Sequence, residues 1–583
     1  MSLIFFDFEV FKNLWTVVFI DPIRQEEKVI VNDRDELKAF YDQHKNEIFV
    51  GYNCRDYDQW IFKAILCGFN PKEMSDWIIK PGIDSDGKQY KRKGREFSDV
   101  TRKNFPINNY DVYTGRNGLK TLEAFMGNDI RETTIPFDYD GEFTPDMIAD
   151  ILKYNRHDVE QTIEVFLRRK PMFDSHRQLL LTFGFNASFI GMTQAQLAAV
   201  ILGAKSVTTK DEWSIRLPDT LRLDKYQHIA DWFLDPKNHY YSKDNFLDTI
   251  VSGVPHTFAW GGVHGAIPKF NYICKPDEVL IMADVNQLYP SLMVEYGLLS
   301  RAVHEPQRFT NVLDTSLRLK AEGKKAEREP YKLICNITYG AMGDKYNKMF
   351  DPLHRNLVCV FGQVLLLDLV EKIEPVCKLI QSNTDGILVL VKKKDVDALK
   401  GIISEWEDRT RLKMAYDEYE KVYQGDVNNY VVVDHKGKYK SKGSYVKSLN
   451  PLDNDLPIVN RAITDYLVEG VHPRDTIMAS DRLIDFQKVV KVSNKYAYGT
   501  LNNHRLTDKT FRVFASKRPE DGIIGKVKAE GGTIEKFANT PEKCFIWNES
   551  VTDVPIPDYL DRDWYLNLAI ERIRDKFNIE VRR

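Results

Sequence analysis

Several features that would point to a particular class of protein are missing from this sequence of 583 residues. The seven cysteines include no C-x-x-C pair, which argues against a zinc site or a disulfide framework and fits a reducing compartment. The net charge is only −3, so overall charge does not indicate a nucleic-acid partner, and any basic surface must be local. No apolar run reaches membrane-spanning length, and the apolar start carries acids instead of a basic segment, so neither a membrane nor a signal peptide is expected.

What is present is typical of a folded chain with several domains. Hydrophobic residues make up 43% and charged residues 29% of the sequence, which are ordinary values for a globular protein. A chain of this length exceeds what one hydrophobic core can organise, so a multidomain α/β protein is expected. We find no internal repeat and no low-complexity segment.

Acidic residues in the N-terminal part favour a metal site. Asp7 and Glu9 alternate in the apolar stretch LIFFDFEV, so on a strand both point to the same face. Asp58 begins a helix-like stretch, and Tyr154 and Asp158 lie four residues apart on one face of a later helix. Four acids from a strand and two helices can form an all-oxygen site suited to Mg²⁺ or Mn²⁺. Surface charge is the alternative for each acid taken singly.

Two further acids each stand beside an apolar run that predicts a buried strand. Asp284 lies near the end of VLIMADV, and Asp385 lies in QSNTDGILVLV, between a polar turn and Ile, Leu and Val residues. A lone carboxylate beside a hydrophobic core is costly unless something pairs with it. We therefore expect the two acids to meet across a sheet and to share two metal ions. For Asp284, an ordinary acid before a turn is the alternative.

A basic segment, LRLKAEGKKAEREPYKLICNITYG, lies between these two acids. Its cations recur at four-residue intervals as Lys320, Lys324, Arg328 and Lys332. Gly323 and Pro330 predict a helical hairpin with cations on both arms. Such a cluster favours an anionic ligand such as a triphosphate. A solvated helix face is the alternative, and the interleaved Glu residues support it.

Together these motifs resemble those of family B DNA polymerases that carry a proofreading exonuclease. D-F-E, the N-x-x-x-Y-D of 53–58 and Y-x-x-x-D are similar to the three exonuclease motifs. DVNQLYPS, KLICNITYG and NTDG are similar to polymerase motifs A, B and C, in the same order. About 50 residues separate motif A from B and ~45 separate B from C, so the chain resembles a compact, phage-type relative without the large insertions of the protein-primed phage branch.

The resemblance implies an α/β multidomain fold with an RNase H-like exonuclease domain and a right-hand polymerase of palm, fingers and thumb. The implied ranges are 1–185 for the exonuclease, 186–255 for a connecting region, 256–300 for the palm with motif A, 301–335 for the fingers, 336–445 for the palm with motifs B and C, and 446–583 for the thumb.

The resemblance also implies two Mg²⁺ or Mn²⁺ ions in each active site. In the exonuclease they would be held by Asp7, Glu9, Asp58 and Asp158. Tyr154 would position the attacking water. In the polymerase, Asp284, Asp385 and the backbone at Val285 would hold them. Two such ions can stabilise both the attacking and the leaving oxygen of a phosphodiester.

Contacts to the incoming nucleotide follow from the same motifs. Lys332 would contact the triphosphate, Lys320 would help from the opposite arm, and Asn336 would face the nucleotide. By similarity, Tyr289 would lie under the sugar and exclude a 2′-hydroxyl, and Tyr339 would pack beneath the templating pair. A core aromatic is the other interpretation of Tyr289.

The chain departs from the family pattern at several positions. Asn383 replaces an Asp that is peripheral in the family, and its carbonyl oxygen could hold a metal-bound water. Gln287 and Ile337 replace serines near the nascent base pair. The K-x-Y motif corresponds to 428–430, NNY, and lacks its lysine. Nearby cations that could supply the charge are Lys438, Lys440 and Lys442. A solvated edge strand is the alternative for these three.

The implied function is a template-directed DNA polymerase with a 3′–5′ proofreading exonuclease. Its partners would be primer–template DNA, deoxynucleoside triphosphates and other replication proteins, and it would act as a monomer. The expected location is the cytoplasm, that of an infected bacterium if the chain is phage-encoded. One alternative is an exonuclease whose weakened polymerase half serves as a DNA-binding platform. Another is a non-catalytic replication scaffold, against which the complete set of exonuclease acids argues.

Overall fold

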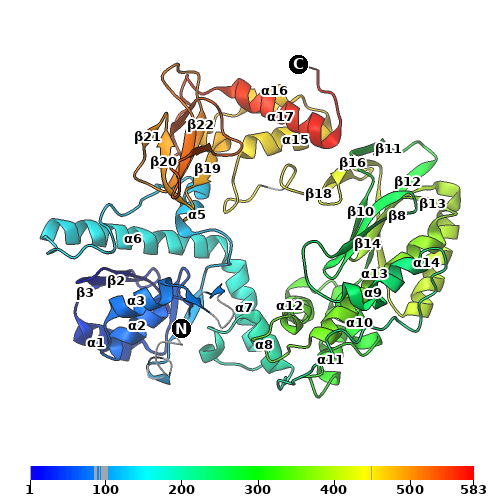
Figure 1. Cartoon of the computed structure of the whole chain (residues 1–583), viewed down its shortest axis with the longest axis horizontal. Coiled ribbons are helices and arrows are strands. Elements are labelled where there is room, and N and C mark those ends of the chain that lie inside the picture. Colours follow the sequence, from blue (N-terminus) through cyan, green and yellow to red (C-terminus); the bar gives the residue numbers. More distant parts are fainter. Residues whose placement is uncertain are drawn as a thin grey trace. The chain divides into compact units, whose positions relative to one another are not determined.

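The computed structural model describes residues 2–83, 88–90, 92, 101, 103–447 and 449–582. The chain forms two compact units of mixed α/β structure, each built from separate stretches of sequence (Figure 1). Unit 1 comprises Met1–Gly191, Leu449–Pro457 and Ser480–Trp564. Unit 2 comprises Met192–Ser448, Ile458–Ala479 and Tyr565–Arg583.

A five-stranded sheet in the order β3-β2-β1-β4-β7 forms the centre of unit 1. Its strands are β1 (Leu3–Val10), β2 (Trp15–Asp21), β3 (Glu26–Val31), β4 (Ile48–Gly51) and β7 (Asn108–Asp111). A separate two-stranded pair is β5 (Gly82–Ile83) with β6 (Gln89–Tyr90). On β1, Phe6 and Phe8 point into a core with Phe19, Phe49 and Phe62, so the alternate acids Asp7 and Glu9 lie on the other face.

Helices cover both faces of this sheet. They are α1 (Arg34–His44), α2 (Asp58–Leu66), α3 (Pro71–Ile79), α5 (Leu119–Met126), α6 (Pro145–Arg168), α7 (Lys170–Thr182) and the short 3₁₀ helix η2 (Ala187–Phe189). Thr144 caps α6 by accepting the backbone N–H of Met147, and Pro145 suits the first helical turn. The long helix α6 packs along β1 and β2 and so faces the acids of β1.

The C-terminal part of unit 1 is built almost entirely of strands. They are β19 (Lys488–Lys491), β20 (Tyr496–Leu501), β21 (His504–Arg505), β22 (Thr510–Ala515), β23 (Ile524–Lys528), β24 (Ile534–Lys536) and β25 (Cys544–Ile546), preceded by the 3₁₀ helix η5 (Leu483–Phe486). They form sheets in the orders β19-β22-β25 and β21-β20-β23-β24. Residues 446–583, expected to form a single thumb, are thus divided between the two units.

Arg512 explains why this C-terminal part belongs to unit 1. Its fully buried guanidinium donates to the carbonyl oxygens of Ala124 at 3.0 Å and Asn128 at 2.8 Å, at the end of α5. Glu132 accepts the backbone N–H groups of Lys509 and Thr510, both at 3.0 Å. A buried charge must be satisfied by hydrogen bonds, so these contacts fix the strands to α5.

Unit 2 contains a seven-stranded sheet in the order β15-β12-β14-β13-β10-β9-β8. The strands are β8 (Phe246–Val251), β9 (Val254–Ala259), β10 (Gly262–Ala266), β12 (Glu278–Val285), β13 (Cys377–Ser382), β14 (Gly386–Lys392) and β15 (Met414–Tyr419). The hairpin expected around NTDG is present as β13 and β14. On β12 the even-numbered Leu280 and Met282 face a second, smaller sheet, with which they share a core that includes Tyr430 and Val432.

The smaller sheet has the order β11-β16-β17-β18. Its strands are β11 (Phe270–Ile273), β16 (Lys421–Asp426), β17 (Asn429–Val433) and β18 (Tyr439–Lys442). The helices of unit 2 up to β15 are α8 (Gln194–Ile201), α9 (Gln227–Leu234), α10 (Leu288–Glu295), α11 (Gln307–Ala321), α12 (Lys325–Met342), α13 (Pro352–Ile373) and α14 (Val396–Thr410), with 3₁₀ helices η3 (Pro236–Asn238) and η4 (Lys393–Asp395). The later helices are α15 (Pro457–Glu469), α16 (Pro473–Ala479) and α17 (Arg562–Phe577), the last belonging to unit 2 from Tyr565 onward.

The basic segment forms a helical hairpin of α11 and α12, as its sequence predicts. Gly323 lies in the turn with a φ of +70°, a conformation that favours glycine. Pro330 does not mark a break, because it lies inside α12. Pro330 lacks the N–H that this position would donate within the helix, and α12 nevertheless continues to Met342.

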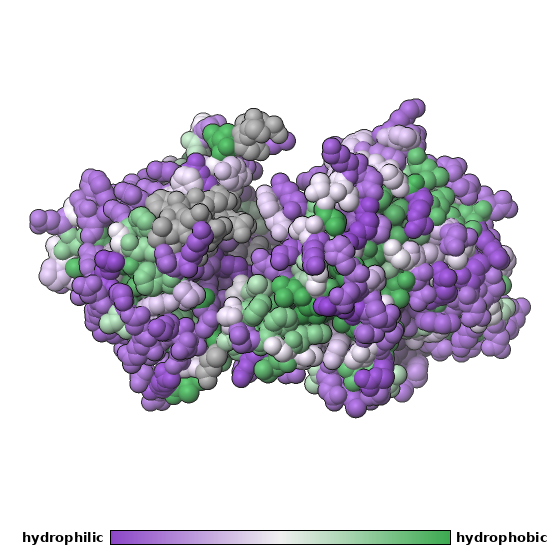
Figure 2. All heavy atoms as spheres, turned by 90° about the horizontal axis from the view of Figure 1, so that it is seen from below, coloured by the Kyte–Doolittle hydropathy of each residue, from purple (hydrophilic) through white to green (hydrophobic). Residues whose placement is uncertain are grey.

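None of the helices in the described part of the chain has the length and apolar content needed to cross a bilayer. Hydrophilic residues cover most of the face drawn in Figure 2, as the charged fraction of 29% leads one to expect.

Candidate active sites

The acids expected to form an exonuclease site come together in unit 1. Carboxylate oxygens of Asp7, Glu9 and Asp158 all lie within 4.8 Å of one another. Asp58, the first residue of α2, accepts the backbone N–H of Phe8 at 3.1 Å and is thereby held against β1. The strand and two helices named in the sequence analysis thus supply one cluster of carboxylates.

Burial and mutual repulsion raise the pKa of each carboxyl group in this cluster. Burial, followed by the charges of neighbouring acids, raises the pKa of Asp7 and of Glu9 well above their usual values. Burial raises the pKa of Asp58 to about 7 and that of Asp158 to about 6. An all-oxygen donor set whose members repel one another fits a hard divalent cation such as Mg²⁺ or Mn²⁺.

Lys120, on α5, is the cation that the sequence analysis missed. Its ammonium donates to Oδ1 of Asp158 and, at 3.0 Å, to Oε1 of the buried Glu123. It also lies 4.6 Å from the centroid of the Tyr154 ring. Although burial opposes its charge, the carboxylates of Asp158 and Glu123 raise its pKa. A single Lys in LKTLEAFM gives no sequence signal for the site, because Asp158 comes from α6 and only Glu123 lies on α5 with it.

Asn155 is a second residue without a sequence signal. Its Nδ2 donates to the backbone oxygen of Asp7 at 3.0 Å and to its Oδ2 at 2.9 Å. The amide therefore fixes the orientation of the Asp7 carboxylate. The neighbouring Tyr154 is largely buried, and burial and then the charge of Asp158 raise the pKa of its hydroxyl.

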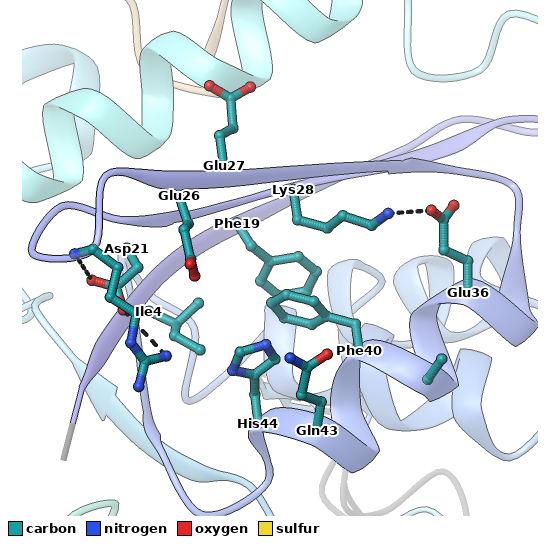
Figure 3. A pocket seen from close by; sticks show the side chains of 12 residues that line it. Ile4, Phe19, Asp21, Glu26, Glu27, Lys28, Glu36, Phe40, Gln43 and His44 are labelled. Carbon is teal, nitrogen blue, oxygen red and sulfur yellow. Dashed lines mark hydrogen bonds and ion pairs between the residues drawn. The ribbon is translucent and has the colours of Figure 1, made fainter.

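A separate cavity of about 430 Å³ lies elsewhere in unit 1, between α1 and strands β2 and β3 (Figure 3). The rings of Phe19 and Phe40 stack at its centre, 4.3 Å apart, and His44 packs against Phe40. Lys28 forms an ion pair with Glu36 at its side. Its lining includes none of the expected exonuclease acids, so the cavity is not part of their cluster.

The two acids expected in the polymerase site are brought together by the strands of unit 2. Asp284, on β12, lies opposite Gly386, the first residue of β14, and the N–H of Val285 donates to the backbone oxygen of Asp385 at 2.7 Å. Burial raises the pKa of Asp284, Lys440 opposes the rise, and the charges of Asp385 and Asp417 add to it. Asp385 is exposed. An oxygen-only pair of this kind fits a divalent cation.

Glycine at 386 is required by the closeness of this pairing. A Cβ on Gly386 would lie 1.9 Å from Oδ1 of Asp284 and 2.9 Å from the backbone oxygen of Ala283, so the carboxylate would have to move. The G of NTDG therefore makes room for the carboxylate of the opposite strand.

Asn383 holds the turn between β13 and β14, a role that its sequence pattern did not predict. Its Oδ1 accepts the backbone N–H groups of Asp385 at 3.1 Å and Gly386 at 2.8 Å. The amide oxygen of Asn383 thus accepts two hydrogen bonds within the turn. Asn383 holds the turn that presents Asp385, as an Asx residue commonly does.

The residues expected to face the nucleotide lie on the helices of unit 2. The rings of Tyr289 and Tyr339 contact each other, with centroids 4.3 Å apart. Lys320, at the end of α11, donates to Oδ1 of Asn286, two residues after Asp284. Asn336 is exposed on α12.

Among the residues that the structure describes, Lys332 forms no ion pair or hydrogen bond with Asp284 or Asp385. The ammonium of Lys332 has Glu329 as its ion partner at 3.7 Å, and the side chain is 39% exposed. Gln287 is the N-cap residue of α10, with a φ of +47°. Its Nε2 lies 3.5 Å from Oγ of Ser316 on α11.

The K-x-Y position and its neighbouring lysines lie on the smaller sheet. Tyr430 is buried, and burial and then the charge of Asp284 raise its pKa. Of the three nearby lysines, Lys440 approaches Asp284, with Nζ 3.8 Å from Oδ2. The alternating lysines of β18 do not show from the sequence which of them contacts Asp284.

No model of a known protein family and no curated protein sequence matches this chain. Among solved structures, the chain is similar to one described as the family B DNA polymerase from the hyperthermophilic archaeon Pyrobaculum calidifontis. The sequence identity is 14% and the TM-score is 0.43, and the alignment covers 100% of this chain and 79% of that chain.

Proposed function

We propose that this chain is a template-directed DNA polymerase of the family B type with a 3′–5′ proofreading exonuclease. The observation that carries the polymerase is the placement of Asp284 beside Asp385 by β12 and β14, with Gly386 making room for the carboxylate. The exonuclease is supported by the cluster of Asp7, Glu9 and Asp158. Both sites carry the motifs that the sequence shares with that family.

In the exonuclease, Asp7, Glu9, Asp58 and Asp158 would hold two Mg²⁺ or Mn²⁺ ions. Ions bound there supply positive charge at the phosphate that is cleaved. Asn155 orients the Asp7 carboxylate, and Lys120 holds Asp158 while its charge offsets part of the repulsion among the acids. Tyr154 places its hydroxyl close to Asp158 and Glu9, where it can orient a water toward the terminal phosphodiester.

In the polymerase, Asp284 and Asp385 would hold the ions, with the backbone at Val285. The reaction joins the primer 3′-oxygen to the α-phosphorus of a deoxynucleoside triphosphate and breaks the bond to pyrophosphate. Lys320 and Lys332, on the two arms of the helical hairpin, would neutralise charge on the triphosphate. The Tyr289 ring, supported by Tyr339, would exclude a 2′-hydroxyl from the sugar position.

A second candidate is an exonuclease whose polymerase half only binds DNA. The observation in its favour is the ion pair between Lys440 and Asp284, because an ammonium already neutralises one of the two essential carboxylates. Primer–template DNA is the substrate of both candidates. For both we propose a compact, phage-type protein that works as a monomer in the cytoplasm of its host.

Primer extension distinguishes the two candidates. A 5′-labelled primer annealed to a longer template is incubated with the chain and Mg²⁺, with and without the four deoxynucleoside triphosphates. The proposed function requires extension to the template end with nucleotides and shortening of the primer without them. Shortening under both conditions would favour the exonuclease alone, and an unchanged primer under both would contradict both candidates. An Asp385→Asn variant is the control for contaminating polymerase.

A further inference from the structure

A histidine lies beside the carboxylates of unit 1, and the proposed exonuclease gives it no role. His157 is next to Asp158 on α6, and Glu123 lies on α5, which packs against α6. One ligand atom from each of Glu123, His157 and Asp158 lies within 4.8 Å of the other two. Two packed helices thus bring an imidazole and two carboxylates together at one point.

Two of these donor atoms are buried without a hydrogen-bond partner. Glu123 is 0% exposed and His157 is 7% exposed. Nε2 of His157 and Oε2 of Glu123 form no hydrogen bond with any residue that the structure describes. The other oxygen of Glu123, Oε1, accepts a hydrogen bond from Lys120. Because buried polar atoms nearly always have a partner, these two atoms indicate that a ligand binds between them.

The distance between the two atoms suits a shared metal ion better than a direct ion pair. Nε2 of His157 lies 3.6 Å from Oε2 of Glu123. A protonated imidazole that donates to a carboxylate comes within about 2.7–2.9 Å of its oxygen. Two donors that bind one ion at about 2.1 Å in a tetrahedral arrangement lie about 3.4 Å apart. The observed spacing is therefore close to that of two ligands of one metal ion.

Charge and access also favour a cation at this point. Lys120 donates to both Glu123 and Asp158, so one ammonium is shared between two buried carboxylates. Asp158 also belongs to the cluster of exonuclease acids, whose charges repel one another. His157 lines a cavity of about 400 Å³ whose other lining residues are all polar or charged, including the exposed Glu160. A hydrated ion can approach the imidazole through this cavity.

We infer that Glu123, His157 and Asp158 bind a divalent transition-metal ion of the Zn²⁺ type, which joins α5 to α6. An imidazole nitrogen beside two carboxylates favours such an ion over Mg²⁺, which prefers oxygen donors alone. A water molecule would complete a four-coordinate site. The inference goes beyond the proposed exonuclease and does not rest on it, although the two sites share Asp158.

Isothermal titration calorimetry of the full, metal-stripped chain with Zn²⁺ tests the inference, with Mg²⁺ in excess in every sample. Wild type should bind a Zn²⁺ ion that His157→Gln binds at least ~10-fold more weakly, since loss of even an indirect partner of a metal ligand costs that much affinity. Glu123→Gln should weaken binding in the same way. The matched control is His228→Gln, which removes an exposed imidazole on α9 and should keep the wild-type affinity. Asp7→Ala with Glu9→Ala removes two oxygen donors of the exonuclease cluster and should retain the Zn²⁺ site.

Two further measurements keep the test decisive if a substitution disturbs folding. Thermal unfolding in EDTA checks that each variant is folded. Co²⁺ in place of Zn²⁺ reports on the wild-type chain itself, because a four-coordinate Co²⁺ ion absorbs visible light far more strongly than a six-coordinate one. Wild type should show the strong absorption and His157→Gln should not. Weak absorption by wild type would contradict the site without the use of any variant.

The inference is overturned if His157→Gln binds Zn²⁺ as tightly as wild type, or if His228→Gln loses as much affinity as His157→Gln. It is also overturned if Asp7→Ala with Glu9→Ala abolishes Zn²⁺ binding, because the ion would then lie among the exonuclease acids. Degradation of a single strand by wild type with Mg²⁺ alone is measured separately. Zn²⁺ binding that depends on His157, without degradation, would refute the exonuclease and leave the metal site standing. Degradation without such binding would refute the metal site alone.

Discussion

The ammonium of Lys440 lies 3.8 Å from Oδ2 of Asp284, a carboxylate to which we assign metal binding. The lysine reaches it from β18 of the smaller sheet, and its Nζ also lies 3.4 Å from the sulfur of Met282 on β12. The K-x-Y position of this chain lacks its lysine, so Lys440 is the cation that stands closest to Asp284 among the described residues. A divalent ion that binds Asp284 must compete with this charge.

Replacing Lys440 should therefore lower the Mg²⁺ concentration needed for half-maximal primer extension. Both side chains are partly exposed, at 49% and 34%, so we expect only the modest effect of an exposed ion pair, about 1.5- to 5-fold. Extension rates of Lys440→Ala are measured over a range of Mg²⁺ concentrations. Lys442→Ala, on the same strand, is the control and should not change the requirement. An unchanged or higher requirement in Lys440→Ala would show that the lysine does not compete with the metal.

Removing the acids of β1 should separate the two activities. Asp7→Ala with Glu9→Ala takes two carboxylates from the cluster in unit 1, so degradation of a single strand should fall by at least ~10²- to 10³-fold. Primer extension should persist, because Asp284 and Asp385 belong to unit 2. Both rates are measured on the same preparation. Degradation at the wild-type rate would refute the exonuclease assignment.

Substitutions at Asp385 should slow primer extension much more than substitutions at Asn383. Asp385→Asn removes a charge that holds the metal ions and should slow single-turnover extension by ~10²- to 10³-fold. Asn383→Asp keeps an oxygen that can accept the two N–H groups of the turn, so activity should remain or need less Mg²⁺. Asn383→Ala loses that cap and should show an intermediate rate. If Asn383→Ala is as slow as Asp385→Asn, Asn383 does more than hold the turn.

Gly386→Ala should abolish extension without affecting degradation. A methyl group at this position would lie 1.9 Å from Oδ1 of Asp284 and must displace the carboxylate or separate β12 from β14. Gly401→Ala is the matched control, because nothing lies within 4 Å of the added carbon. Gly401 is inside α14, where alanine should raise stability by ~0.5–1 kcal/mol. Extension and thermal unfolding are measured for both variants, and normal extension by Gly386→Ala would contradict the pairing described here.

Tyr289→Val should raise the incorporation of ribonucleotides relative to deoxynucleotides. The smaller side chain removes the ring that contacts Tyr339 and leaves space for a 2′-hydroxyl. We expect a change of at least ~10-fold in the ratio of the two kcat/KM values, the scale on which pocket size discriminates between substrates. Tyr289→Phe keeps the ring and should keep the ratio. Equal ratios in wild type and Tyr289→Val would mean that Tyr289 only packs.

The sequence by itself determined the features that depend on local pattern. Alternation in LIFFDFEV places Asp7 and Glu9 on one face of a strand, and a four-residue spacing places Tyr154 and Asp158 on one face of α6. The apolar runs beside Asp284 and Asp385 predict the strands that bring the two acids together. These inferences succeed because strand and helix geometry fix the direction of side chains a few residues apart.

Tertiary structure alone decided the contacts between residues that are distant in the sequence. Lys120 reaches Asp158 because α5 packs against α6, and Lys440 reaches Asp284 because the smaller sheet packs on β12. The assignment of Ser480–Trp564 to unit 1 depends on the carbonyl oxygens that surround Arg512. The sequence does not show which residue a charged side chain will pair with, because the packing of separate helices and strands decides this. Once such a side chain is buried, it needs that partner, since an unpaired buried charge is costly.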